Sequence, residues 1–376
     1  MRAAVVTETR PGERRVAATP ETVGKLAAAG WTVVVQSGAG VRAAAEDAEY
    51  AAKGAELVGS AKEALDGADV LLAVTPPSDD VIAAMPNGCA LIGLLEPTAP
   101  TTPLQALAGR GATAFSLELL PRTSRAQAMD ALSSQALVAG YRAVIEASMR
   151  LPRFFPMAMT AAGTVPPARV FVIGAGVAGL QAIATSRRLG AIVEASDVRA
   201  AAAEEVKSLG AKFVDLTEGQ SLEGEGGYAR AATEEELAEQ RSRLSDHLST
   251  QDVVITTAAV PGRKAPVLVT TEMVERMRPG SVIFDLAAET GGNCELSKPG
   301  EDVLYKGVTI IGAQQVPSAM AKDASALYAR NVSTFLLLMT KEGAFAPDFE
   351  DDLVIGSCIL RDGQPVHPLV KEALGA

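Results

Sequence analysis

Three glycines stand at spacings that suit the binding of a dinucleotide. Gly174, Gly176 and Gly179 follow a short apolar run and open a helical pattern. The first glycine permits a sharp turn, the second lets backbone approach a pyrophosphate, and the third lets the helix pack closely on the strand. The free amides at the start of that helix, which includes Val177 and Ala178, are expected to face the phosphates.

An acidic residue completes this pattern. Asp197 follows a second apolar run at 191–195, about 20 residues after the glycines, where a carboxylate accepts hydrogen bonds from ribose hydroxyls. It would also repel a 2′-phosphate, so NAD(H) is favoured over NADP(H). Val198 and Arg199 come next, and the Arg199 guanidinium leaves open the alternative that a phosphate is accommodated there.

A second polar set precedes a long helical pattern at 129–149. Arg122 offers a planar fork of donors, and the amide of Gln127 can both donate to and accept from a carboxamide. A structural alternative is that Asp130 caps the helix and pairs with Arg122. Gly140 lies inside this helix at a cost of about 1 kcal/mol relative to alanine, so we expect another segment to approach closely there.

Length and composition predict two α/β domains. The chain has 376 residues, of which 48% are hydrophobic and only 4% aromatic, a composition that suits parallel sheets. The net charge of −11 argues against nucleic acid as a partner. No signal peptide and no membrane span of about 18 apolar residues is recognised, so we expect a cytoplasmic protein. The cysteines, Cys89, Cys294 and Cys358, have neither disulfide nor metal spacing.

Strand and helix patterns alternate along both halves of the chain. This predicts two doubly wound, Rossmann-like domains with mostly parallel sheets, joined by two long helices with a cleft between them. The first domain is expected at 1–133 plus 321–376, and the NAD(H)-binding domain at 134–320. The tail, 353–360 followed by Asp362-Gly363, is predicted to be a hairpin.

Two loops of the second domain are further candidates. Thr257 and Ala258 follow a strand at 252–256 and are expected to face the nicotinamide half of the crevice. The polar segment 217–243 contains Gly227 and Tyr228. It is either a solvated loop or a lid that brings Tyr228 over bound nucleotide, and from the residues alone the solvated loop is favoured.

Four long motifs in one order extend these patterns into a resemblance. They are Pro-Gly-Glu-Arg-Arg-Val-Ala at 11–17, and the segments 121–135, 159–168 and 226–229. Over its whole length the chain resembles the NAD(H)-binding component, domain I, of proton-translocating NAD(P) transhydrogenase, in the alanine dehydrogenase/transhydrogenase superfamily.

This resemblance implies a function and a set of partners. The chain would transfer hydride from NADH to NADP⁺ held on an NADP(H)-binding beta subunit, coupled to proton translocation by a transmembrane subunit. It would be a homodimer that is peripheral to the membrane through its partners. A loop at the nicotinamide would contain the catalytic residues and further nucleotide contacts, and Tyr228 would close over the adenosine side; the loop residues are Arg122, Thr123, Ser124, Arg125, Gln127, Asp130 and Ser133.

Two other functions are alternatives to this one. An alanine dehydrogenase is similar in fold and uses a lysine and a histidine in its first domain, but Thr75 stands where the lysine would be and the segment 91–98 has no histidine. Arg15 remains from the shared motif. A non-catalytic NADH-binding module would not require the second polar set. No metal site is expected.

Overall fold

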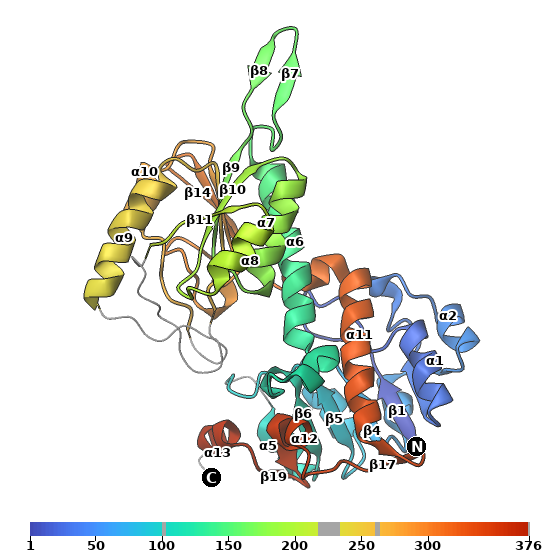
Figure 1. The fold of residues 1–376 in the computed structure, drawn as a ribbon. Coiled ribbons are helices and arrows are strands. Elements are labelled where there is room, and N and C mark those ends of the chain that lie inside the picture. Colours follow the sequence, from blue (N-terminus) through green and yellow to red (C-terminus); the bar gives the residue numbers. More distant parts are fainter. Residues whose placement is uncertain (100–102, 217–233, 260–263, 375–376) are drawn as a thin grey trace. The chain divides into compact units, whose positions relative to one another are not determined.

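Short apolar runs form the strands of two sheets, one in each of two units. The structure, a computed structural model, describes residues 1–99, 103–216, 234–259 and 264–374. Unit 1 comprises Met1–Gln135 and Pro317–Ala376, and unit 2 comprises Ala136–Val316 (Figure 1).

Unit 1 contains an eight-stranded sheet in the order β19-β18-β6-β5-β4-β1-β2-β3. The six strands β1 to β6 pair in parallel, and β18 and β19 add antiparallel pairs beyond β6. The strands are β1 (Arg2–Val5), β2 (Thr32–Gln36), β3 (Glu56–Val58), β4 (Val70–Leu72), β5 (Ala90–Gly93), β6 (Thr113–Ser116), β18 (Cys358–Arg361) and β19 (Gln364–Pro365).

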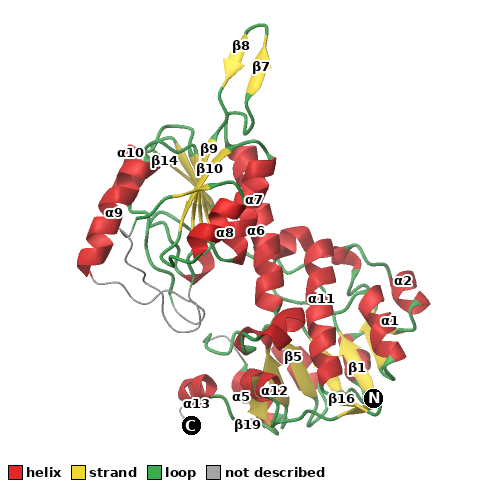
Figure 2. Cartoon of the chain, in the orientation of Figure 1, coloured by secondary structure: helices red, strands yellow, loops and turns green. Residues whose placement is uncertain are grey.

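Helices cover both faces of this sheet, as Figure 2 shows in red around yellow strands. Each face has its own buried apolar cluster. The helices are α1 (Pro20–Ala28), α2 (Asp47–Ala52), α3 (Ala61–Leu65), α4 (Asp79–Ala84), α5 (Leu104–Gly109), α11 (Ala321–Leu338), α12 (Asp352–Ser357) and α13 (Pro368–Leu374), with the 3₁₀ segment η3 (Ser124–Met129) and a small ribbon of β16 (Thr340–Lys341) and β17 (Ala344–Phe345).

Unit 2 repeats this plan with seven strands in the order β11-β10-β9-β12-β13-β15-β14. Only β14 is antiparallel among the pairs described. The elements are β9 (Arg169–Ile173), α7 (Val177–Arg188), β10 (Ile192–Ser196), α8 (Ala202–Ser208), β11 (Lys212–Phe213), α9 (Glu234–Leu248), β12 (Val253–Thr256), α10 (Thr271–Arg276), β13 (Val282–Asp285), β14 (Asp302–Tyr305) and β15 (Val308–Gly312).

These sheets confirm the predicted α/β fold class. The central strand β9 is fully buried at Val170, Phe171 and Val172, as expected for a parallel strand covered on both faces. Of the two long helices predicted at the connections, α6 (Ala131–Arg150) begins in unit 1 and continues into unit 2, whereas α11 lies within unit 1. The return connection is the 3₁₀ segment η6 (Val316–Met320).

The tail prediction was wrong in its first half. Residues 353–357 belong to helix α12, because Asp351 accepts a hydrogen bond from the Leu353 amide at 2.9 Å and caps the helix. The hairpin itself is confirmed at β18 and β19, with Asp362 and Gly363 both at positive φ in its turn.

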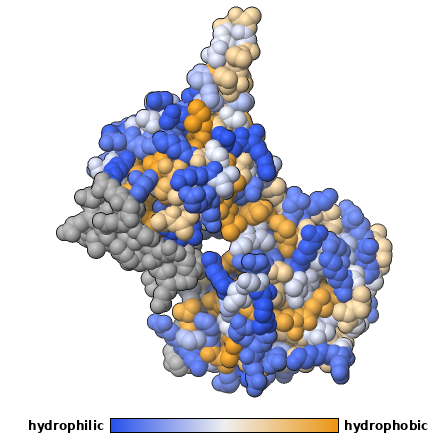
Figure 3. Space-filling view, viewed as in Figure 1, coloured by the Kyte–Doolittle hydropathy of each residue, from blue (hydrophilic) through white to orange (hydrophobic). Residues whose placement is uncertain are grey.

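A second hairpin was not predicted as an element. Strands β7 (Ala158–Thr160) and β8 (Gly163–Val165) pair antiparallel and project from the body of unit 2 (Figure 1). Much of the projection has the pale to orange colours of neutral and apolar residues in Figure 3, and Met157 and Met159 are exposed at 57% and 73%. Separately, none of the helices in the described part of the chain has the length and hydropathy needed to cross a bilayer.

Candidate functional site

The three glycines of unit 2 occupy three different environments. Gly174, at φ +97°, makes the turn that follows β9, a conformation that side chains rarely adopt. A Cβ at Gly179 would overlap the carbonyl oxygen of Gly174, so only glycine allows α7 to pack this closely on the turn. Gly176 is exposed, and a Cβ there would meet nothing within 4 Å. The turn therefore leaves its backbone open at the middle glycine.

The first turn of α7 also has a close neighbour. Val177 is exposed and Ala178 is half-buried. A Cβ at Gly140 of helix α6 would overlap the carbonyl oxygen of Ala178. This confirms the expectation of a close approach at Gly140, and the approaching segment is the start of the helix that follows the glycine turn.

Asp197 lies at the end of β10, beside the glycine turn, with its side chain 7% exposed. Its Oδ2 accepts a hydrogen bond from the Ala175 amide at 2.7 Å, which ties the second strand to the turn. The Arg199 amide and guanidinium donate to the same carboxylate at 2.8 to 3.1 Å, and the guanidinium also reaches the Ala175 carbonyl at 3.3 Å. Val198 between them is half-buried. Sequence reasoning did not predict this anchoring of Asp197.

Thr257 joins the end of β12 to the glycine turn. Its hydroxyl donates to the carbonyl of Gly174 at 3.0 Å, and its amide donates to Ile173 at 2.9 Å. The adjacent Ala258 exchanges hydrogen bonds with the side chain of Asn293, at 3.1 Å from the Ala258 amide and 2.8 Å to its carbonyl. Two residues predicted at the nicotinamide half thus lie beside the turn predicted at the phosphates.

The second polar set lies in unit 1, on η3 and the start of α6. Asp130 accepts hydrogen bonds from the amide and hydroxyl of Ser133 at 2.8 and 2.5 Å, so these two residues form the helix cap. Arg122 and Gln127 are exposed. In this structure, then, the structural role considered for Asp130 is present whether or not the residue also meets a nucleotide.

Neighbouring residues fix this segment from outside the set. Arg125, predicted to contact nucleotide, instead pairs with Asp351 and Asp352 at 2.5 and 3.0 Å. Asn331 of α11 donates to the carbonyl of Ala128 at 2.9 Å. Thr123 and Ser124 are exposed. Neither the acidic pair nor Asn331 carried a signal in the sequence, because each is more than 200 residues away.

The predicted lid residues Gly227 and Tyr228 lie outside the residues that the structure describes. Nothing in the described part of the chain tests their role. Of the described residues, no group of three or more His, Cys, Asp or Glu is arranged to hold a metal ion.

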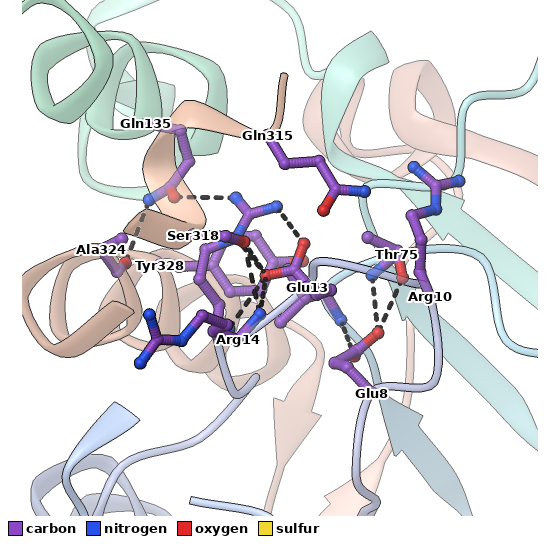
Figure 4. Close-up of polar contacts among 12 residues, drawn as sticks. Glu8, Arg10, Glu13, Arg14, Thr75, Gln135, Gln315, Ser318, Ala324 and Tyr328 are labelled. Atoms are coloured by element: carbon purple, nitrogen blue, oxygen red, sulfur yellow. Dashed lines mark hydrogen bonds and ion pairs between the residues drawn. The ribbon is translucent and has the colours of Figure 1, made fainter. Parts of the chain in front are cut away.

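Arg15, the residue shared with amino-acid dehydrogenases, is buried and fully engaged (Figure 4). Its guanidinium binds both oxygens of Glu13 at 2.8 and 2.7 Å and the side-chain oxygen of Gln135 at 2.9 Å. Ser318 donates to Glu13 as well. Burial alone would raise the Glu13 pKa, but the hydrogen bonds and charge of Arg15 lower it to about 2. This pair is a structural unit in the interior.

Thr75 is bound to a second buried carboxylate, Glu8. The Thr75 hydroxyl donates to Glu8 at 2.7 Å, and the Val74 amide donates at 2.6 Å (Figure 4). Burial raises the Glu8 pKa to about 7, against the smaller lowering effect of these donors. The position where an alanine dehydrogenase would have its lysine is therefore part of a neutral hydrogen-bonded cluster near pH 7.

Comparisons with known proteins agree with this division. Residues 4–139 match the family model "Alanine dehydrogenase/PNT, N-terminal domain", and residues 143–368 match "Alanine dehydrogenase/PNT, C-terminal domain". An alanine dehydrogenase of Mycobacterium tuberculosis is 33% identical over 305 residues, which are 80% of this chain and 76% of that one.

Two transhydrogenase proteins are more similar. The first of the chains that make up the NAD(P) transhydrogenase alpha subunit of Rhodospirillum rubrum is 48% identical over 377 residues and 98% of each chain. The crystal structure of a transhydrogenase from Sinorhizobium meliloti matches with a TM-score of 0.88 at 46% identity, over 97% of this chain and 100% of that one. The chain therefore belongs to the alanine dehydrogenase/PNT family, as a member of its transhydrogenase alpha-subunit group.

Proposed function

We propose that this chain binds NAD(H) through unit 2 and is the NAD(H)-binding component of a proton-translocating transhydrogenase. The glycine turn is the observation that carries this proposal. Gly174 and Gly179 allow no side chain, while Gly176 leaves backbone open at the N-terminus of a twelve-residue helix. A pyrophosphate requires this combination of close backbone approach and helix amides.

Asp197 is proposed to select the adenosine ribose. Its carboxylate is already held beside the turn by Ala175 and Arg199, so it is oriented before a ligand arrives. Asp197→Asn should weaken NADH binding by about tenfold and reduce the preference for NADH over NADPH, since a charged acceptor is lost. An unchanged preference would remove Asp197 from the ribose contact.

The proposed reaction is direct transfer of hydride between two nicotinamide rings. Hydride leaves C4 of NADH and joins C4 of NADP⁺ on the partner subunit, which yields NAD⁺ and NADPH with no proton moved by this chain. The chain's task is then to hold its ring in contact geometry. We assign this task to Arg122 and Gln127, with Asp130 and Ser133 fixing the start of the helix behind them.

Further parts of the complex follow from the relatives named above. An NADP(H)-binding beta subunit and a transmembrane subunit would complete the enzyme, couple it to proton translocation and hold this chain at the membrane. The exposed hairpin β7–β8, with Met157 and Met159, is assigned to contact with a second copy in a homodimer. Gly227 and Tyr228 are proposed to close over the adenosine side.

The experiment mixes this chain with a separately purified NADP(H)-binding component and follows reduction of a spectroscopically distinct NAD⁺ analogue by NADH. Turnover that requires both proteins is the expected result. Binding of NADH without turnover would support the non-catalytic module instead. Oxidation of alanine with NAD⁺ would support an amino-acid dehydrogenase, which the engaged Arg15 and Thr75 argue against.

A further inference from the structure

Asn293 binds three separate segments of unit 2 and is completely buried. Its side-chain oxygen accepts from the Ala258 amide, and its side-chain nitrogen donates to the carbonyls of Ala258 and Pro266, both at 2.8 Å. Its own carbonyl accepts the amides of Leu268 and Val269 at 2.8 and 2.9 Å. An amide is the one side-chain type that can satisfy both the donor and the acceptor of Ala258 in this way.

Asp285, at the end of β13, holds Asn293 in place. Its Oδ2 accepts the amides of Asn293 and Cys294 at 2.8 and 3.0 Å. Its Oδ1 accepts from the hydroxyl of Thr256 at 3.0 Å, so it also reaches the last residue of β12. A Cβ at Gly292 would come within 3.0 Å of the Asp285 carboxylate, and Gly292 has a φ of +78°, so glycine is needed for this approach.

The held segment has a defined place in the topology. Strands β9, β10 and β11 run to one side of the sheet and β12, β13 and β15 to the other, so the strand order reverses between β9 and β12. A dinucleotide lies across such a reversal, with one half on each side. Asp197 follows β10 on the adenosine side, which leaves Thr257 and Ala258, after β12, on the nicotinamide side.

We infer that Asn293, oriented by Asp285, is a positioning residue that fixes the Ala258 backbone for the nicotinamide half of the bound nucleotide. This inference rests on the proposed NAD(H) function. It assigns to Asn293 no contact with the ligand. Its effect passes through Ala258, while the adenosine half is held by Asp197 and the glycine turn independently.

The test compares two ligands on the full chain. NADH carries both halves, whereas ADP carries only the adenosine half. Asn293→Asp keeps the acceptor for the Ala258 amide but places an oxygen against two carbonyls. We expect the Kd for NADH to rise about tenfold and the Kd for ADP to change less than twofold. The exposed Asn87→Asp is the matched control, for which neither Kd should change.

The outcomes separate a positioning role from a merely structural one. Equal losses for NADH and ADP, or no loss for either, would overturn the inference while leaving the proposed function intact. If the unmodified chain binds neither ligand, the proposed function fails and the inference fails with it. If Asn293→Asp does not fold, hydrogen exchange of the Ala258 amide in the ligand-free natural chain decides: protection is expected, and exchange at the rate of an open peptide would refute the inference.

Discussion

The two units reverse their strand order at equivalent places, yet they treat those places differently. In unit 1 the reversal lies between β1 and β4, and the buried Glu8 side chain takes the Val74 amide there. In unit 2 it lies between β9 and β12, where Gly174 makes a turn and Gly176 leaves backbone open. One fold thus has a closed edge and an open edge, and side-chain chemistry decides which one can take a ligand.

The largest expected effect breaks the closed edge of unit 1. Arg15→Met removes the cation from a buried pair and leaves the Glu13 carboxylate without it, which should cost about 3–5 kcal/mol of unfolding free energy. Chemical denaturation measures this, with the exposed neighbour Arg14→Met as the control. NADH affinity of the folded variant should stay within twofold under native conditions, because we assign Arg15 no ligand. Loss of NADH binding at normal stability would make the closed edge a site.

A second change tests whether unit 1 contributes through η3 instead. Gln127→Asn shortens the amide by one methylene, and a displacement of about 1 Å can slow hydride transfer about 100-fold. The reconstituted reaction gives the rate, and NADH titration gives the affinity, which should fall much less. Gln105→Asn, at an exposed position of α5, should leave both unchanged. Equal losses in rate and affinity would reduce Gln127 to a simple binding contact.

Two glycines inside helices, one in each unit, sharpen the comparison of packing. Gly140→Ala forces a methyl group into the Ala178 carbonyl and should destabilise the protein by about 1–3 kcal/mol. Gly24→Ala in α1 meets only Lys53, at 3.6 Å, and should stabilise it by about 0.5–1 kcal/mol. Thermal unfolding of both variants measures the signs. The same sign for both would mean that the contact at Ala178 yields easily.

The smallest expected effect concerns pH. The Glu8 pKa is raised to about 7 in the folded chain, so between pH 4.5 and 7 the folded state binds more protons than the unfolded state. Stability from this group is therefore present at low pH and falls as pH rises through 7, by at most about 1.4 kcal/mol per pH unit. Glu8→Gln should flatten this slope in denaturation curves between pH 5 and 8. An unchanged slope would mean that Glu8 titrates normally.

Local patterns predicted much of the fold and the glycine turn. Buried parallel strands such as β9 are continuous apolar runs, and the roles of Gly174 and Gly179 depend on residues close in the chain. The partners of the candidate residues were beyond reach. Arg125 meets Asp351 across 226 residues, and only the folded chain brings them together. The helix α12 was missed because its short apolar run fits a strand equally well until the cap at Asp351 is seen.

The tail strands β18 and β19 have a consequence for how the protein is made. They pair onto β6, so the sheet of unit 1 includes strands from both ends of the sequence. Unit 2 is continuous from Ala136 to Val316 and holds all seven strands of its own sheet. During synthesis on the ribosome, unit 2 can complete its sheet before residues 317–376 have emerged, whereas unit 1 must wait for them. The nucleotide-binding half is thus ready to fold before the half that precedes it in the sequence.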